Sequence, residues 1–326
     1  MKSYLDLRET EIGIKLVKDH FERTLAQALH LMRVSAPLFV LADSGLNDNL
    51  SGTERPVSFD ILETGRHAEI VHSLAKWKRQ ALGRYKFIVG EGLYTDMNAI
   101  RRDEITDPLH SLYADQWDWE RVICEVDRTM DTLHETVRLI YGAMHDTQDM
   151  IKGHYPMLPS YLPQEITFIT TAELEATYPA LDHDERERVF AKEHGAICVT
   201  QIGGKLPSGQ RHGTRAPDYD DWQLNADIIL DYPELDTAME ISSMGIRVSP
   251  QSMLAQLQDV GCMDRCELPY HKELLAGQMP FTIGGGIGQS RLCMYFLKKM
   301  HIGEVQASIW PDDLISQYAA SGITLL

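Results

Sequence analysis

The chain has 326 residues, of which 44% are hydrophobic, and a formal net charge of −17. This length and hydrophobic content predict a large folded unit with its own core, and the acidic charge disfavours nucleic acid and anionic membranes as partners. No run of ~18 apolar residues predicts a membrane span. The five scattered cysteines are typical of reduced thiols, so we expect a soluble protein of the cytoplasm.

The first part of the chain predicts a helix followed by short strands. Apolar residues recur at three- and four-residue steps from residue 9 to residue 32, which indicates a long amphipathic helix. The next run, 33–41, is typical of a strand, and because its Pro37 cannot donate to a β-ladder we place it at an edge or a subunit boundary. After a polar loop, the pattern predicts a helix at 75–84 and strands at 57–62, 68–73 and 85–89.

A strand–turn–strand pattern occupies residues 91–120. In its second strand Gln116, Asp118 and Glu120 alternate with two tryptophans, Trp117 and Trp119. Successive side chains of a strand point to opposite faces. One face should therefore carry an amide and two carboxylates, while the other buries both indoles.

The rest of the chain continues this mixture. Helices are expected at 121–150, 181–194 and 250–260, strands at 166–170, 196–202, 226–232 and 237–248, and loops at 156–164, 203–221 and up to Pro280. No repeat or composition break indicates a linker. We therefore expect a single domain, 1–326, with an α+β fold in which a predominantly antiparallel sheet is flanked by helices.

The most unusual stretch is FTIGGGIGQSRLCMYF at 281–296. Its glycines, at 284, 285, 286 and 288, leave the backbone without Cβ atoms, so a flat ligand could lie against it. Arg291 then opens a predicted helix and places a planar charged group beside this surface, which favours a nucleotide site. The alternative is a glycine-rich turn with a surface arginine. The dinucleotide fingerprint and the P-loop are both excluded, because neither glycine pattern fits.

Two further clusters could carry chemistry. Arg101, with Asp103 and Glu104, ends a strand beside the polar face of residues 116–120, and an arginine there can neutralise charge that develops on a phosphate. Asp227 and Glu240 lie on facing strands, and such hard oxygen ligands suit Mg²⁺ bound together with substrate phosphates. The alternative for each cluster is a solvated sheet face.

Together these clusters resemble the class II aminoacyl-tRNA synthetase catalytic domain. The segment from Arg101 to Glu120 resembles its motif 2, the segments at 240–247 and 284–291 resemble the run into motif 3, and the first helix with Pro37 is similar to motif 1, the dimer element. Over nearly the whole chain the sequence resembles the ammonia-dependent aspartate ligases, the asparagine synthetase A family. The segments that carry this are NDNLSG (47–52), HSLAKWKRQ (72–80), GEGLYT (90–95), DQWDWE (115–120), APDYDDW (216–222), EISSMGIRV (240–248) and GGGIGQSRL (284–292).

The resemblance implies a reaction in which aspartate, ATP and ammonia give asparagine, AMP and pyrophosphate through a β-aspartyl-adenylate. It implies that Arg101 holds the α-phosphate and that Gln116 donates to the reacting carboxylate oxygen or to the adenylate. Arg291 and Asp218 are expected to bind the nucleotide. Mg²⁺ is expected on Glu240 and Asp227.

The same resemblance assigns the amino acid and the nucleophile. Lys78 is expected to bind the α-carboxylate of aspartate and Asp118 its α-amino group. Asp48 is expected to position ammonium and take its proton, because ammonia is almost wholly protonated at neutral pH. Further substrate contacts are expected from Ser73, Ser242 and Ser243. Each assignment has an alternative: Lys78 lies in a charged run typical of a solvated helix, and Asp48 could cap a turn.

Free ammonia is the expected nitrogen donor, since residue 2 is lysine and no cysteine precedes Cys124. No anticodon-binding barrel is expected before the first helix, so no nucleic-acid partner is predicted, and the motif 1 resemblance implies a homodimer. Two rival hypotheses remain. One is a synthetase-like protein that transfers the activated amino acid to tRNA or protein, and the other is a non-catalytic sensor of aspartate or nucleotide.

Overall fold

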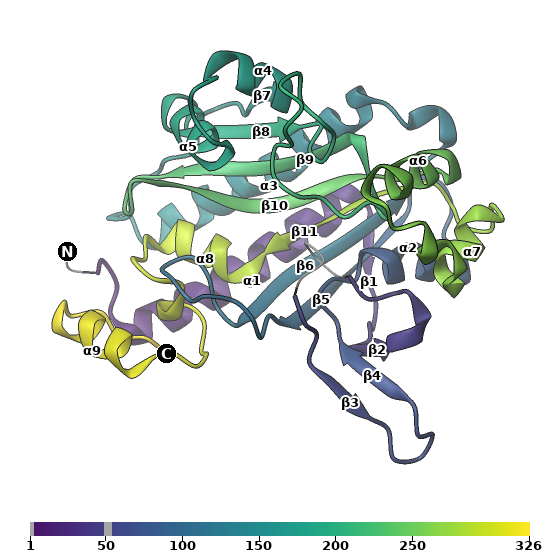
Figure 1. Cartoon of the computed structure of the whole chain (residues 1–326). Coiled ribbons are helices and arrows are strands. Elements are labelled where there is room, and N and C mark those ends of the chain that lie inside the picture. The colour runs from purple at the N-terminus through teal and green to yellow at the C-terminus, as the bar shows by residue number, and fades with distance from the viewer. Residues whose placement is uncertain (1–2, 49–53) are drawn as a thin grey trace.

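An eight-stranded sheet forms the centre of the computed structural model, which describes residues 3–48 and 54–326 (Figure 1). Neighbouring strands are antiparallel except at the two ends of the sheet, where β1 pairs with β5 and β7 with β8 in parallel. The expected α+β fold with a predominantly antiparallel sheet is confirmed. In spatial order the strands are β1 (Leu31–Arg33), β5 (Gly92–Ile100), β6 (Tyr113–Val122), β11 (Thr282–Gly288), β10 (Thr237–Arg247), β9 (Asp220–Tyr232), β8 (Ala196–Thr200) and β7 (Thr167–Thr170).

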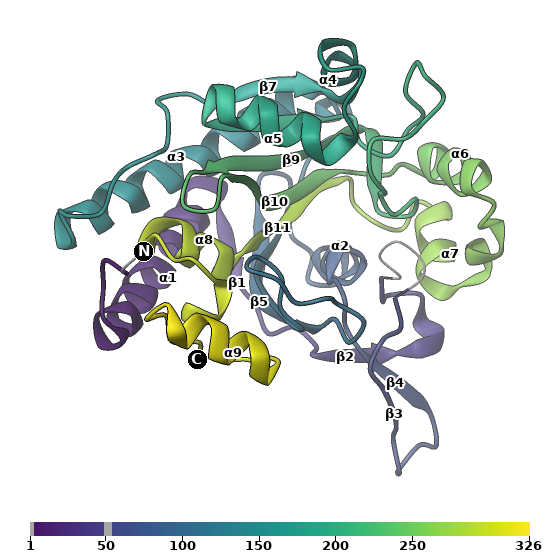
Figure 2. The same cartoon turned by 60° about the vertical axis from the view of Figure 1, so that its left-hand side comes forward.

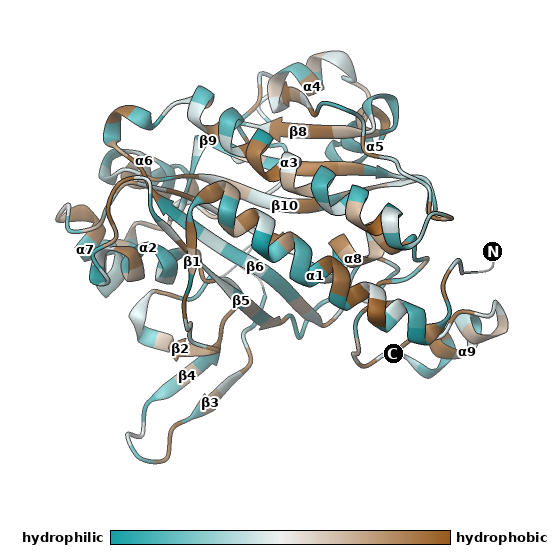
Figure 3. Ribbon diagram, turned by 180° about the vertical axis from the view of Figure 1, so that it is seen from behind, coloured by the Kyte–Doolittle hydropathy of each residue, from teal (hydrophilic) through white to brown (hydrophobic). Residues whose placement is uncertain are grey.

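Two long helices, α1 (Leu7–Leu29) and α3 (Met130–His154), cover one face of this sheet (Figure 3). Asp6 caps α1, because its carboxylate accepts from the backbone N–H of Glu9 while the Glu9 side chain returns a bond to Asp6. Phe21 of α1 lies against Trp117 of β6, with ring centroids 4.9 Å apart. Trp117 and Trp119 are both buried in the core between sheet and helices, so the predicted alternation along β6 is confirmed.

The opposite face of the sheet carries shorter elements. Figure 2 shows α2 (Ala75–Arg84), α6 (Pro250–Val260) and α7 (Pro269–Leu275) on the side away from α1 and α3. The remaining helices are α4 (Thr171–Thr177), α5 (His183–His194), α8 (Gln289–Leu297) and α9 (Asp312–Ala320), with 3₁₀ turns at Ala42–Ser44, Glu125–Asp127, Met263–Glu267 and Ile302–Glu304. A small projecting sheet has the order β2 (Phe39–Leu41), β4 (His67–Ile70) and β3 (Ser58–Asp60).

Within the described ranges, no helix is both long enough and apolar enough to cross a bilayer. Cys124, Cys198, Cys262, Cys266 and Cys293 are all free thiols.

Several predicted boundaries are wrong. The run 33–41 is not one strand, since β1 ends at Arg33, β2 begins at Phe39 and Pro37 lies between them. No strand forms at 85–89, where Lys86 adopts a φ of 59° and the chain turns. The helix expected from residue 121 begins only at Met130, because β6 runs to Val122 and the Thr129 hydroxyl caps the helix. Helix α4 and the helix α7 in the loop before Pro280 were not predicted. The predicted polar loop at 44–52 lies partly outside the described residues.

The glycine-rich stretch is a strand in the middle of the sheet, with β6 on one side and β10 on the other. A Cβ atom on Gly284 would collide with the Glu120 carboxylate, and one on Gly286 would collide with the carboxamide of Gln116. These glycines therefore make room for side chains of β6. The expectation of a bare surface along the whole run is wrong at Gly284, where the Glu120 carboxylate fills the space.

We predict that Gly284→Ala lowers the free energy of unfolding by about 2 kcal/mol, because the new methyl group must displace the buried carboxylate of Glu120. The matched control is Gly142→Ala in the middle of α3, where a Cβ would meet no atom within 4 Å. That change should stabilise the protein by about 1 kcal/mol. Urea unfolding of both variants measures the difference. Equal stability of the Gly284→Ala variant and the unsubstituted chain would contradict this packing argument.

Candidate active site

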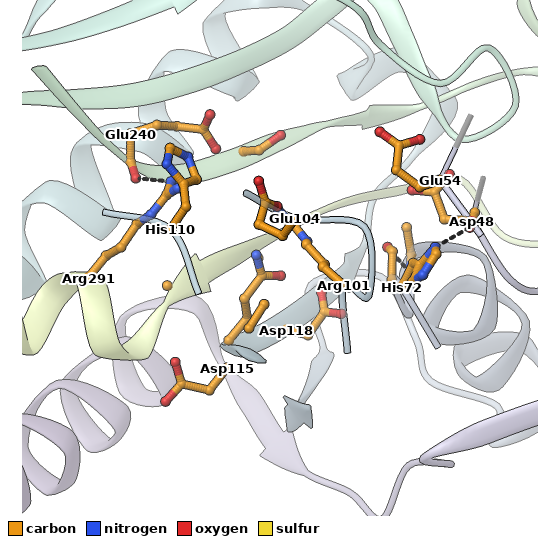
Figure 4. A pocket seen from close by; sticks show the side chains of 18 of the residues that line it. Asp48, Glu54, His72, Arg101, Glu104, His110, Asp115, Asp118, Glu240 and Arg291 are labelled. Atoms are coloured by element: carbon orange, nitrogen blue, oxygen red, sulfur yellow. Dashed lines mark hydrogen bonds and ion pairs between the residues drawn. The ribbon is translucent and has the colours of Figure 1, made fainter. Parts of the chain in front are cut away.

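A cavity of about 470 Å³ opens on the face of the sheet away from α1 and α3. Arg291, Glu240 and His110 lie at one end of it and Asp48, Glu54 and His72 at the other, with Arg101 and Glu104 between them (Figure 4). The cavity gathers most of the predicted site residues, which are Asp48, Ser73, Lys78, Arg101, Gln116, Asp118, Asp227, Glu240, Ser243 and Arg291.

A buried ion pair supports the floor of this cavity. Arg247 of β10 donates from Nε and Nη2 to the carboxylate of Glu120 on β6, at 2.9 and 2.7 Å, and the Thr282 hydroxyl donates to the same carboxylate at 2.7 Å. Asp220 of β9 accepts from the other side of the Arg247 guanidinium. Burial alone would raise the pKa of Glu120, but the Arg247 charge and these hydrogen bonds lower it overall. One network thus holds four adjacent strands in register.

Lys78 reaches the same floor from α2. Its ammonium donates to Asp118, to the carbonyl of Trp119 at 2.8 Å and to the carbonyl of Gly285 at 3.0 Å. Burial lowers the pKa of Lys78 despite its acidic neighbours. All three ammonium hydrogens therefore have protein acceptors, so a substrate carboxylate could bind Lys78 only by replacing one of them.

Arg101 and Gln116 present open donors to the middle of the cavity. Arg101 approaches Glu104 only at 3.8 Å, and its buried Nε has no hydrogen-bond partner. The Gln116 side chain makes no hydrogen bond to the residues that the structure describes, although Gly286 is shaped around it. Donors left open in this way can serve a ligand at no cost to the fold.

Asp227 and Glu240 form a wall with an arginine that the sequence analysis did not single out. Arg215, in the loop before β9, donates to Asp227 at 2.8 Å, to Asp220 at 3.0 Å and to the hydroxyl of Ser243. Burial raises the pKa of Asp227 to about 7, against the effect of Arg215, and repulsion from Glu240 adds to the rise. A cation bound between the two carboxylates would relieve this repulsion.

These two carboxylates fit a magnesium ion only in part. In residues 3–48 and 54–326, no group of three or more metal-ligating side chains converges. Mg²⁺ commonly takes one or two carboxylates and completes its shell with phosphates and water. The pair can therefore hold Mg²⁺ together with a nucleotide but does not form a closed metal site by itself.

The two ends of the cavity carry different side chains. At one end Arg291 donates to the backbone carbonyl of Glu240 at 2.8 Å, and His110 lies beside it, held at 2.8 Å by Asp107. At the other end Asp48 is buried and accepts from the Tyr219 hydroxyl at 3.0 Å. Burial and the Asp48 charge raise the pKa of Tyr219 well above its ordinary value. Tyr219 therefore remains a donor to Asp48 at physiological pH.

Two predicted residues do not line the cavity. Asp218 is fully buried beside it and pairs with Lys76 at 3.2 Å, Arg265 at 3.1 Å and His271 at 2.9 Å. Ser242 is also buried, and its hydroxyl has no partner. Because it adjoins Ser243 on β10, the two side chains point to opposite faces, and only Ser243 faces the cavity. The sequence analysis missed the roles of three residues, Arg215, Tyr219 and Arg247. They lie within or next to the segments 216–222 and 240–248, but their spacing gave no sign of which partners they contact.

Comparison with solved structures defines the class of the fold. The asparaginyl-tRNA synthetase of Pyrococcus horikoshii in complex with asparaginyl-adenylate superimposes with a TM-score of 0.64 at 15% identity, over 93% of this chain and 70% of that one. The asparaginyl-tRNA synthetase of Entamoeba histolytica, also with asparaginyl-adenylate, gives 0.61 at 14% identity, over 92% and 66%. The chain therefore has the fold of a class II aminoacyl-tRNA synthetase catalytic domain.

Comparison of sequences defines the family. The family model described as aspartate-ammonia ligase matches residues 8–322. Proteins named aspartate–ammonia ligase from Clostridium perfringens and Ruminiclostridium cellulolyticum are each 58% identical over 326 residues, which is 100% of this chain and 97% of theirs. One from Fusobacterium nucleatum is 59% identical over 312 residues, 96% of this chain and 95% of that protein. The chain belongs to the aspartate–ammonia ligase family, and the predicted ligase class is confirmed.

The lowered pKa of Glu120 predicts a pH dependence of stability. A carboxyl group whose folded-state pKa is depressed stabilises the fold above its unfolded pKa, and this contribution is lost as the pH falls through the folded value. The free energy of unfolding should therefore fall below about pH 4.5, and Glu120→Gln should flatten this fall. At neutral pH the variant should lose about 3 kcal/mol, because Arg247 keeps its buried charge without its main partner.

Urea unfolding over a series of pH values measures this dependence. Glu165→Gln is the control, since Glu165 is exposed and should leave the slope unchanged. The same acid slope in the Glu120→Gln variant and the unsubstituted chain would remove Glu120 as the source.

Proposed function

We propose that this protein joins aspartate and ammonia to form asparagine, using ATP, through a β-aspartyl-adenylate that releases pyrophosphate and then AMP. The observation that carries the proposal is the cavity that places the donors of Arg101 and Gln116 between Arg291 at one end and Asp48 at the other. A nucleotide and an amino acid can meet in such a cavity with their reacting atoms at Arg101.

In the first step the β-carboxylate of aspartate attacks the α-phosphorus of ATP. A P–O bond forms to the carboxylate, and the bond to pyrophosphate breaks. Arg101 neutralises the charge that develops on the phosphorus, and Gln116 donates to the reacting carboxylate oxygen. Arg291 binds the nucleotide. Glu240 and Asp227 would hold Mg²⁺, which when bound neutralises phosphate charge.

Recognition of aspartate uses the floor of the cavity. Lys78 would exchange one of its protein acceptors for the α-carboxylate, and Asp118 would accept from the α-amino group. Ser73 and Ser243 also line the cavity and would provide further contacts to the substrate. Asp218 and Ser242 lie outside the lining, so we give them no contact with a substrate.

In the second step ammonia attacks the acyl carbon of the adenylate. Asp48 takes a proton from ammonium, and Tyr219 holds the Asp48 carboxylate while it does so. A C–N bond forms, and the C–O bond to AMP breaks with its electron pair leaving on the phosphate. The remaining excess proton departs from nitrogen as the amide forms. Splitting the reaction in this way replaces a poor electrophile, the carboxylate, with an activated acyl group.

A homodimer in the cytoplasm is part of the proposal. Met32, Leu38 and Phe39 are each about half exposed, and Ile88 and Val89, in the turn before the strand that pairs with β1, are more than half exposed. An apolar edge of this kind favours burial against a second copy. The free thiols support a reducing compartment. Sedimentation of the protein as a monomer at working concentrations would contradict the dimer.

The purified protein should form AMP and asparagine from ATP, Mg²⁺, aspartate and ammonium without RNA. The readouts are chromatography of the nucleotides and amino-acid analysis. Aspartate omission and ammonium omission are the controls, and each should abolish asparagine. Formation of AMP only after tRNA is added would instead support transfer to tRNA.

Replacing Arg101 by alanine should lower turnover by at least ~100-fold, because charge on the transferring phosphoryl group loses its open donor. The fold should persist, since Arg101 makes no close ion pair. Arg84→Ala at the exposed end of α2 is the control and should keep full activity. Near-normal turnover of the Arg101→Ala enzyme, with a matching circular dichroism spectrum, would remove Arg101 from the reaction.

A further inference from the structure

At the acidic end of the cavity, the side chain of Asn47 holds Asp48 and His72 next to each other. The carboxamide oxygen of Asn47 accepts from the backbone N–H of Asp48 at 3.0 Å and from that of His72 at 2.9 Å. The Asn47 amide nitrogen is itself held by Glu69 at 2.9 Å. One side chain thus fixes the backbones of two segments against each other, and both Asp48 and His72 line the cavity (Figure 4).

The structure determines which nitrogen of His72 carries the proton. Nδ1 lies 3.2 Å from the backbone carbonyl oxygen of Asp48. A carbonyl oxygen only accepts hydrogen bonds, so Nδ1 must carry the hydrogen, and in the neutral ring Nε2 must present a lone pair. The His72 residue is 2% exposed, and Nε2 is buried without a hydrogen-bond partner.

His72 thus keeps a ring nitrogen without a protein partner and also lines the cavity, so a ligand that carries a donor could satisfy that nitrogen. Two acidic side chains line the same end of the cavity as His72. Asp48 is fixed by Tyr219, and Glu54 lines the same end of the cavity. The Asp48 carboxylate and the Nε2 lone pair of His72 both accept hydrogen bonds, so this end suits a small cation that carries N–H donors.

We propose that Nε2 of His72 accepts a hydrogen bond from the ammonium ion, so that His72 recognises and orients the nucleophile while Asp48 balances its charge. This inference rests on the proposed function and adds a contact residue to it. Ammonium has four donors and no lone pair, so it matches a carboxylate and a locked imidazole lone pair. Once Asp48 has taken one proton, the bond to Nε2 still holds the ammonia. Rotation about that bond can then turn the new lone pair toward the acyl carbon.

The test uses two substitutions, each of which replaces only one of the two ring nitrogens of His72. Asparagine places its amide near Nδ1, so His72→Asn keeps a donor to the Asp48 carbonyl and removes the acceptor at Nε2. Glutamine extends to the position of Nε2, so His72→Gln restores an acceptor there. We expect His72→Asn to raise the KM for ammonium by about 10- to 100-fold. His72→Gln should recover part of that loss, and the KM values for ATP and aspartate should change little.

A second measurement isolates the nucleophile from the fold. Exchange of labelled pyrophosphate into ATP with aspartate alone reports the adenylate step, and this rate should be the same in both variants and the unsubstituted enzyme. Equal increases in the KM for aspartate and for ammonium, loss of the exchange in His72→Asn, or an unchanged KM for ammonium would each overturn the role of His72. Absence of the exchange in the unsubstituted enzyme would instead count against the proposed function.

Discussion

The structure of the site depends on one buried ion pair, in which the Arg247 guanidinium donates two hydrogen bonds to the Glu120 carboxylate. Each group would be strongly destabilising if it were buried alone, but Thr282, Asp220 and Lys78 complete the network. The members come from β6, β9, β10, β11 and α2, so a shift of any one strand would break hydrogen bonds to a buried charge. Gly284 is part of the same arrangement, because only a residue without a side chain leaves room for the carboxylate. The network therefore fixes the floor of the cavity.

The polar side chains around this floor are of two kinds: those whose hydrogen bonds are all made to the protein, and those that lack a protein partner. Lys78 and Arg215 have their donors occupied by protein acceptors, and they set the shape and the charge of the cavity. Among the described residues that line the cavity, Arg101, Gln116 and His72 each keep a polar side-chain group without a hydrogen-bond partner. All three residues line the same cavity. In the proposed reaction Arg101 and Gln116 serve the transfer of the adenylyl group, and His72 serves the nitrogen nucleophile.

Much of the architecture could be predicted because its signals are local. The alternation of Trp117 and Trp119 with polar residues gave both the strand and its buried face, and apolar spacing gave α1. The ranges of α2 and α6 were predicted to the residue. The strand prediction failed where pairing with distant segments decides the structure. The run around Pro37 has strand-like composition, but its two halves pair with different sheets. Composition does not say which neighbour a strand will find, because pairing depends on distant parts of the chain.

The sequence by itself determined the family, the reaction class and most of the residues that reach the cavity. These residues lie in short contiguous segments, which can be recognised from the sequence without the fold. Only the tertiary structure decided which of them are available. Asp218 and Ser242 both lie in segments that resemble the family motifs. The Asp218 carboxylate is paired with three protein side chains, those of Lys76, Arg265 and His271. Ser242 faces away from the cavity. The carbonyl that locks the His72 tautomer is likewise 24 residues distant in sequence. Availability depends on hydrogen bonds between remote segments, and those exist only once the chain has folded.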